Sequence, residues 1–190
     1  MNSRRPMIPS VTWLILQMDS LMDEHQFWSI LEDAWNSDSG LTAFRKDVLA
    51  TIDSESGKEE FDEKYDDDPM IPNEETLLAS IREKLNTLTK EELHQFDVIL
   101  ERKLYDIDRQ EIQAQTDGSD DGFLYCRGFI VAMGKEYYEA VNRDPSNAMF
   151  DWECESITYI SWHMYTEKFG DMPSSGISRE SCSNTKGWSD

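Results

Sequence analysis

The stretch TKEELHQFDVILERKLYDI, residues 89–107, decides the fold more than any other part of the chain. It begins with Thr89, followed three residues later by Glu92, which is the pattern of a helix capping box. Apolar side chains then recur every three or four residues, and this spacing predicts one buried face of a long α-helix. These apolar residues are Leu93, Phe96, Leu100, Leu104 and Ile107. No proline interrupts the pattern before about Gln115, so we expect the helix to continue that far.

The same spacing recurs on both sides of this stretch and predicts further helices. Asp23 and Gln26 form a second capping box, Thr42 is expected to cap the next helix, and Gly134 is expected to end another. The expected helices cover residues 23–36, 42–52, 73–88, 89–115 and 119–133, a short helix that ends at Asp144, and a last helix over 146–169. We find no strand pattern and no internal repeat. The sequence therefore predicts an all-α fold, a compact bundle of six or seven helices.

Composition divides the chain into a central domain with a different segment at each end. Residues 22–170 carry the helical pattern and are expected to form a single domain, preceded by an N-terminal extension over residues 1–21. Inside the domain lies an acidic insertion, residues 53–72, whose first sixteen positions hold nine acids and two lysines. We expect this insertion to be either solvated and mobile or a weak helix followed by a loop. Residues 171–190 are rich in Ser, Gly and Asn and predict a disordered C-terminal tail.

Negative charge is the strongest functional signal in the sequence. The 190 residues include 39 Asp and Glu against 18 Lys and Arg, which gives a formal net charge of −21 and an isoelectric point near 4.3. Such a chain repels phosphate groups, so we expect no direct binding to nucleic acid and no docking on an anionic membrane surface. The plainest interpretation of the charge is solubility. The sharper one is a surface complementary to a basic protein partner.

Sequence motifs of enzymes and metal sites are absent or incomplete. The turn that begins at Asp117 resembles a calcium-binding loop, but its twelfth position is Gly128, which has no side chain that can bind a metal. His163 and Glu167 lie one helical turn apart, a spacing that also arises often by chance. No nucleophile elbow, phosphate-binding loop or dinucleotide fingerprint is present. We therefore expect no catalytic residue, no metal and no cofactor, and a protein that is not an enzyme.

Arg127 is a charged residue that the pattern places among apolar neighbours, Cys126 and Phe129-Ile130. It follows Asp120 by one heptad, so both side chains are expected on the same side of a helix. Because a half-buried arginine needs a carboxylate partner, we expect a structural ion pair between Asp120 and Arg127. The alternative is a site around Asp120, Asp121 and Arg127, which would make the chain a ligand-binding or enzymatic helical domain.

A family resemblance is carried mainly by SDDGF, residues 119–123, together with Arg127, Gly134, Tyr138 and Pro145. With the Phe27-Trp28 pair and Phe96, these residues make the segment from about 22 to 170 resemble an uncharacterised bacterial family, domain of unknown function 4240. The chain departs from the family pattern at Cys126, where the family has an aromatic residue, at Phe129, where it has Trp, and at Asp117-Gly118, where it has two glycines. The resemblance implies an all-helical fold and supplies no catalytic residues.

These observations together predict an acidic protein-binding domain. We expect a cytoplasmic bacterial protein that neutralises a basic protein partner, most concretely an immunity-type inhibitor of a toxin. The three cysteines are too few and too scattered for a disulfide framework, in keeping with a reducing compartment. Acidic side chains of the insertion and of the turn before residue 122 are the candidates for partner binding: Asp66, Asp67, Asp68, Asp117, Asp120 and Asp121.

Overall fold

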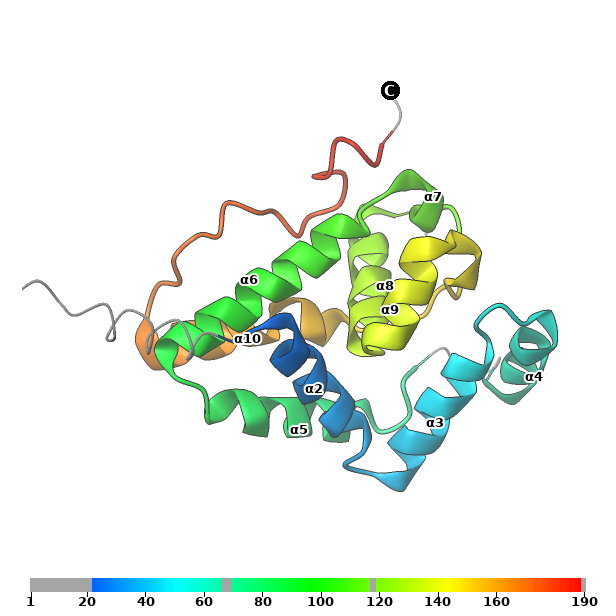
Figure 1. Cartoon of the computed structure of the whole chain (residues 1–190), viewed down its shortest axis with the longest axis horizontal. Helices are drawn as coiled ribbons and strands as arrows, with labels where there is room; N and C mark the ends of the chain where they lie inside the picture. Colours follow the sequence, from blue (N-terminus) through cyan, green and yellow to red (C-terminus); the bar gives the residue numbers. More distant parts are fainter. Residues whose placement is uncertain (1–21, 66–69, 117–118, 189–190) are drawn as a thin grey trace, which may run out of the picture.

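The computed structural model describes residues 22–65, 70–116 and 119–188, and within these ranges all regular structure is helical (Figure 1). The helices are α2 (Glu24–Trp35), α3 (Ser39–Ala50), α4 (Glu55–Tyr65), α5 (Glu74–Asn86), α6 (Lys90–Asp106), α7 (Gln110–Gln113), α8 (Asp120–Ala132), α9 (Lys135–Arg143) and α10 (Glu155–Phe169), with a 3₁₀ turn, η1 (Pro145–Asn147). The predicted all-α fold is confirmed. The predicted number of helices is too low, because the described residues contain nine α-helices. The expected extension over residues 1–21 lies outside the described residues.

The core forms where α10 packs against α5, α6 and α8, and where α2 packs against α5 and α6. The predicted apolar face of α6 is buried over its whole length. Its central residue, Phe96, lies 4.8 Å from Phe27 of α2, measured between ring centroids. Burial of such a stripe is the main source of stability for helices that are individually short.

Local capping signals fix most of the helix starts. Asp23 and Thr89 each form the predicted capping box, and the Ser119 hydroxyl accepts a hydrogen bond from the Gly122 amide at the start of α8. The prediction that Thr42 caps the second helix is wrong. The Asp38 carboxylate accepts hydrogen bonds from the first amides of α3. The Thr42 hydroxyl instead donates to the backbone carbonyls of Trp35, which ends α2, and of Asp38 itself.

Two predicted helices are shorter than expected. The helix expected over 89–115 ends at Asp106, and the chain turns through the fully buried Asp108 before the single turn of α7. The helix expected over 146–169 begins only at Glu155, because residues 148–154 form an irregular loop. In both cases apolar spacing continues past the helix, and long-range contacts rather than local propensity set the boundary.

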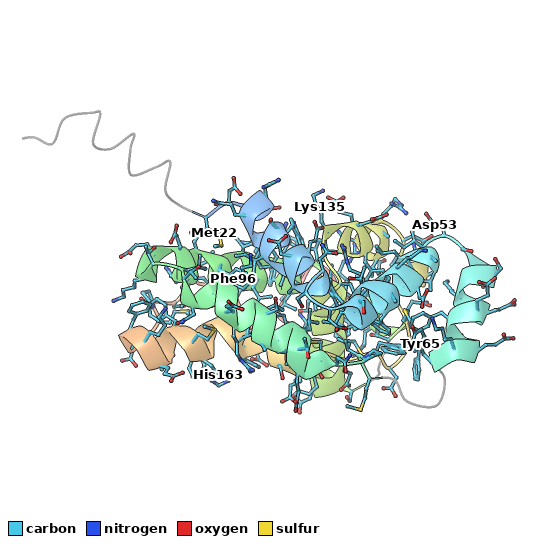
Figure 2. The ribbon with its side chains drawn as sticks, turned by 90° about the horizontal axis from the view of Figure 1, so that it is seen from below. Met22, Asp53, Tyr65, Phe96, Lys135 and His163 are labelled. Carbon is cyan, nitrogen blue, oxygen red and sulfur yellow. The ribbon has the colours of Figure 1, made fainter. Side chains whose placement is uncertain are left out.

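The acidic insertion is partly a helix. Its residues 55–65 form α4, and at the buried side of α4 the Phe61 ring packs against Phe44 of α3 and Trp152 of the loop, with ring centroids 5.8 and 5.2 Å apart. In Figure 2, α4 with Tyr65 forms one end of the molecule. The helical alternative for this segment is therefore the one observed.

The expectation of a disordered C-terminal tail is wrong for residues 171–188, which we call the strap. The strap contains no helix, yet it lies along α6 from the end of α10 towards α7 (Figure 1). Arg179 and Asn184 of the strap are buried against the helices, with 5% and 9% of their surface exposed. Polar composition suggested disorder, but specific contacts to charged groups on the helices order the segment.

Gly128 marks the closest approach of α8 to α10. A Cβ atom at this position would lie 2.5 Å from the Cys154 carbonyl oxygen and 2.8 Å from the Thr158 methyl group. We expect Gly128→Ala to lower the free energy of unfolding by about 1–3 kcal/mol through overpacking, although alanine favours a helix by about 1 kcal/mol over glycine. Urea denaturation measures the change.

Gly40→Ala is the matched control for this substitution. Gly40 is also helical, but its nearest neighbour is a side-chain oxygen of Asp38 at 3.0 Å, which can move. We expect a change within about 0.5 kcal/mol. A Gly128→Ala variant as stable as the Gly40→Ala variant would contradict the close packing of α8 on α10.

Candidate functional site

The loop between η1 and α10 presents one aromatic side chain to solvent. Met149 and Trp152 are buried, with 9% and 6% of their surface exposed, whereas Phe150 between them is 72% exposed. Asp151 has a φ of 62°, a left-handed backbone conformation that is uncommon for residues other than glycine. Strained backbone of this kind persists where neighbouring contacts hold it in place. The two buried anchors and this turn together fix Phe150 in an outward position.

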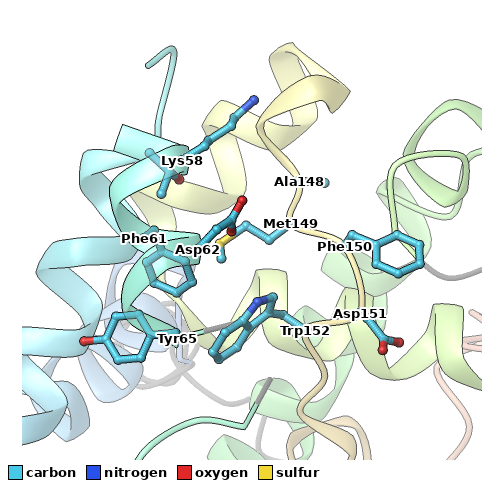
Figure 3. Close-up of a pocket in the computed structure, with 10 residues that line it drawn as sticks. Lys58, Phe61, Asp62, Tyr65, Ala148, Met149, Phe150, Asp151 and Trp152 are labelled. Carbon is cyan, nitrogen blue, oxygen red and sulfur yellow. The ribbon is translucent and has the colours of Figure 1, made fainter. Parts of the chain in front are cut away.

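A hollow of about 510 Å³ lies between this loop and α4 (Figure 3). In Figure 3, Phe61 and Tyr65 project from α4 beside Trp152, while Phe150 lies on the side of the loop away from α4. The hollow is lined by Thr51, Lys58, Phe61, Asp62, Tyr65, Ala148, Met149, Phe150, Asp151 and Trp152. Its walls are therefore aromatic, and charged side chains lie at its edge.

Polar contacts attach α4 to the rest of the molecule and so set the shape of this hollow. Lys64 Nζ lies 2.6 Å from a carboxylate oxygen of Asp47 on α3, and the Tyr65 hydroxyl donates to the same oxygen at 2.9 Å. The hydrogen bond from Lys64 lowers the pKa of Asp47, which keeps this carboxylate ionised. At the other end of α4, Lys58 Nζ donates to the Ser146 carbonyl at 2.8 Å.

Two further hollows adjoin the first, because neighbouring hollows share lining residues. One, of about 390 Å³, shares Asp151 with the first hollow, and the other, of about 600 Å³ between α5 and α10, shares Glu155 and Ser156 with the second. We call the residues that line the three hollows the acidic surface. Its carboxylates are Asp62, Glu74, Asp151, Glu153, Glu155 and Glu167, and its basic residues are Lys58 and Arg82. Met70, which is 60% exposed, adds a second apolar side chain beside these carboxylates.

Cys154 lies beneath this surface and is chemically inert. Its thiol is buried and donates a hydrogen bond to a Glu74 carboxylate oxygen at 3.5 Å. Burial, reinforced by the charge of Glu74, raises the pKa of the thiol far above its usual value. A thiol that stays protonated is neither a nucleophile nor a metal ligand.

Of the six predicted partner-binding residues, the structure describes the side chain of Asp121 alone. Asp66, Asp67, Asp68 and Asp117 lie outside the described residues, as does the side chain of Asp120. Asp121 is exposed at the start of α8, but it lines none of the three hollows. Sequence reasoning missed the loop residues around Phe150 because their apolar spacing was interpreted as part of a helix.

Arg127 is fully buried, so it does not line an open ligand site. Its guanidinium donates to the Leu104 carbonyl at 2.8 Å and to the Ser181 hydroxyl of the strap at 3.1 Å, and it lies 4.8 Å from the Phe123 ring centroid. Burial lowers the pKa of Arg127 to about 10, so the group remains charged at neutral pH. The predicted pair with Asp120 stays a prediction, since that side chain is outside the described residues.

Other kinds of site find little support in the part of the chain that the structure describes. No group of three or more His, Cys, Asp or Glu side chains there is arranged to hold a metal ion. His163 and Glu167 both line the hollow between α5 and α10, together with Arg82. In the same ranges, no helix is both long and apolar enough to cross a membrane.

The fold and this surface define a small helical domain whose carboxylates surround exposed apolar side chains. The chain belongs to the family described as protein of unknown function (DUF4240), which matches residues 59–167. The match starts inside the acidic insertion and ends within α10, so it includes all three hollows in large part but not the strap. No curated protein and no solved structure matches the chain.

Phe150 and Trp152 offer a direct test of the loop geometry. Because Phe150 is exposed, we expect Phe150→Ala to change the free energy of unfolding by no more than about 0.5 kcal/mol. Trp152 contacts the rings of Phe44, Phe61 and Phe129, so Trp152→Ala should cost about 3–5 kcal/mol. Denaturant unfolding of both variants measures the difference. Equal losses would show that Phe150 also belongs to the core.

Proposed function

We propose that the chain is an acidic protein-binding domain that neutralises a basic protein partner, in the manner of an immunity-type inhibitor of a bacterial toxin. The acidic surface is the observation that carries the proposal. Six carboxylates and two basic residues line its three adjoining hollows, and Phe150 projects beside them. A positively charged surface with an apolar recess is the complement of this arrangement.

The excess of carboxylates is not cancelled by pairing within the chain. Ten lysine and arginine side chains among the described residues form ion pairs with carboxylates. Of the two basic residues on the acidic surface, Lys58 is one of these and is paired with Glu55. The field of this surface is therefore negative, which accelerates encounter with a basic partner and weakens as salt is added.

The exposed apolar side chains give the surface a means of tight binding as well as attraction. In protein interfaces a few aromatic anchors supply most of the affinity, and the charged rim supplies orientation and rate. Phe150 has the properties of such an anchor, because it is aromatic, exposed and held by a loop in which Met149 and Trp152 are buried. Pre-organisation of this kind lowers the entropic cost of binding.

Inhibition by occlusion requires no catalytic group, cofactor or metal in the chain itself. We propose a bacterial cytoplasmic setting, in which the inhibitor meets the toxin where it would act. Among the described residues, Cys126, Cys154 and Cys182 form no disulfide bond, which is compatible with that reducing compartment. Enzymatic chemistry around Arg127 finds no comparable support, since that guanidinium is buried beneath the strap.

Removing two negative charges from the acidic surface tests the proposal. We expect Asp62→Asn combined with Asp151→Asn to weaken binding of the basic partner by about tenfold or more at low salt, chiefly by slowing association. Asparagine tolerates the left-handed conformation at position 151, so the fold should be retained. Partners are captured from an extract of the source cell on immobilised protein at low salt, purified and then measured by surface plasmon resonance.

The matched control removes two charges from elsewhere on the molecule. Glu83→Gln combined with Asp171→Asn gives the same net charge, but neither residue lines the three hollows. We expect this variant to lose less than about threefold in affinity. If both double variants bind alike, or if no basic protein is retained at low salt, the acidic surface is not the binding site.

A further inference from the structure

The strap is held mainly by a binding site for one arginine. The Arg179 guanidinium donates to Asp97 at 2.9 Å and to Glu101 at 2.7 Å, both on α6, and also to the Thr158 carbonyl of α10. It lies 5.1 Å from the ring centroid of Tyr159, so a cation–π contact covers its flat face. Two carboxylates, a carbonyl and an aromatic ring thus surround one guanidinium, which is the geometry that favours arginine over lysine.

A second anchor receives the backbone of the strap just after the arginine. The buried carboxylate of Asp108 accepts hydrogen bonds from the Cys182 and Asn184 amides at 3.0 and 2.8 Å. The same carboxylate accepts the Trp188 indole N–H at 3.1 Å. Arg127 donates to the hydroxyl of Ser181, two residues beyond the arginine. The helical part of the protein therefore binds three features of the extended strap. These are the arginine side chain, the hydroxyl group two residues after it, and the backbone amides that follow.

These contacts are characteristic of peptide recognition rather than of a core. The strap has no regular structure, and only Met172 and Trp188 among its apolar side chains pack on the core as partly buried residues. Furthermore, Asp97, Glu101, Asp108, Arg127 and Tyr159 all lie within the segment that matches the family, whereas the strap lies outside it. Arg127 Nε is buried without a hydrogen-bond acceptor, so the strap leaves one donor of this face unused.

We propose that one face of the protein is a binding site for an extended arginine-bearing peptide segment, and that the strap occupies it as an internal competitor. This strap-binding face is formed by Asp97, Glu101, Asp108, Arg127 and Tyr159. The site goes beyond the acidic surface and does not depend on its function. A partner segment with an arginine followed two residues later by a hydroxyl would satisfy the same groups. Because the tethered strap is present at a high effective concentration, a segment in trans gains access only when the strap is released.

A variant of the full chain that loses the strap contacts tests this site. Arg179→Ala, Asn184→Ala and Trp188→Ala change only strap side chains and leave the strap-binding face intact. The probe is a fluorescently labelled synthetic peptide of residues 173–188, measured by fluorescence anisotropy. We expect this peptide to bind the triple variant at least about tenfold more tightly than the wild-type chain, in which the strap competes.

Two controls distinguish specific recognition of the arginine from nonspecific binding. A peptide with alanine in place of Arg179 should bind the triple variant at least about tenfold more weakly, because Asp97 and Glu101 lose their partner. In the chain, Arg143→Ala removes an arginine from an exposed pair with Asp53 and should bind the probe no better than wild type. Equal binding of the two peptides, or no saturable binding to a helical triple variant, overturns the proposal.

Hydrogen exchange of the wild-type chain covers the case in which the triple variant loses its helical fold. If the strap is a separable ligand, its amides exchange through local opening, well before those of α6 and α8. Exchange of the strap only together with α6 would show that the strap is part of the folded body. That result overturns the proposal, whether the triple variant folds or not.

Discussion

The need to satisfy two buried carboxylates, Asp97 on α6 and Asp108 just after it, organises one whole side of the protein. Asp97 is 2% exposed and Asp108 is fully buried. A carboxylate removed from water costs several kcal/mol unless it is paired or hydrogen-bonded. Arg179 pairs with the first, and backbone amides of the strap satisfy the second. The path of the last eighteen described residues follows from these two requirements.

The second of these carboxylates lies where the central helix ends. Apolar spacing alone would let α6 continue, but the helix ends at Asp106, and Asp108 just beyond it accepts amides from the strap. Burial raises the pKa of Asp97, while the nearby carboxylates raise the pKa of Arg179. The arginine therefore stays charged under all ordinary conditions, and Asp97 is the member of the pair whose charge is penalised by burial.

The sequence predicted those helix starts that depend on interactions between residues close together in the chain. The capping boxes at Asp23 and Thr89 depend on residues three positions apart, and both were predicted correctly. Residues 148–154 were expected to be helical, because nothing in the sequence around Trp152 reveals that this residue packs on Phe61 of α4. The strap docks through a contact between Arg179 and Asp97, which lie 82 positions apart in the sequence. Polar composition could not indicate such a contact. The acidic surface was missed for the same reason: its residues meet only after the loop and α4 have packed.

Tyr159 connects the strap to the acidic surface. Its ring lies against Arg179 and its hydroxyl donates to Glu180 of the strap at 2.8 Å, yet the residue also lines the hollow between α5 and α10. Burial and the bond to Glu180 raise the pKa of this hydroxyl to about 12, so it remains a donor at any physiological pH. The strap therefore fixes one wall of that hollow. Release of the strap would free the Tyr159 side chain, and the occupant of one face would then influence the shape of the other through a single shared residue.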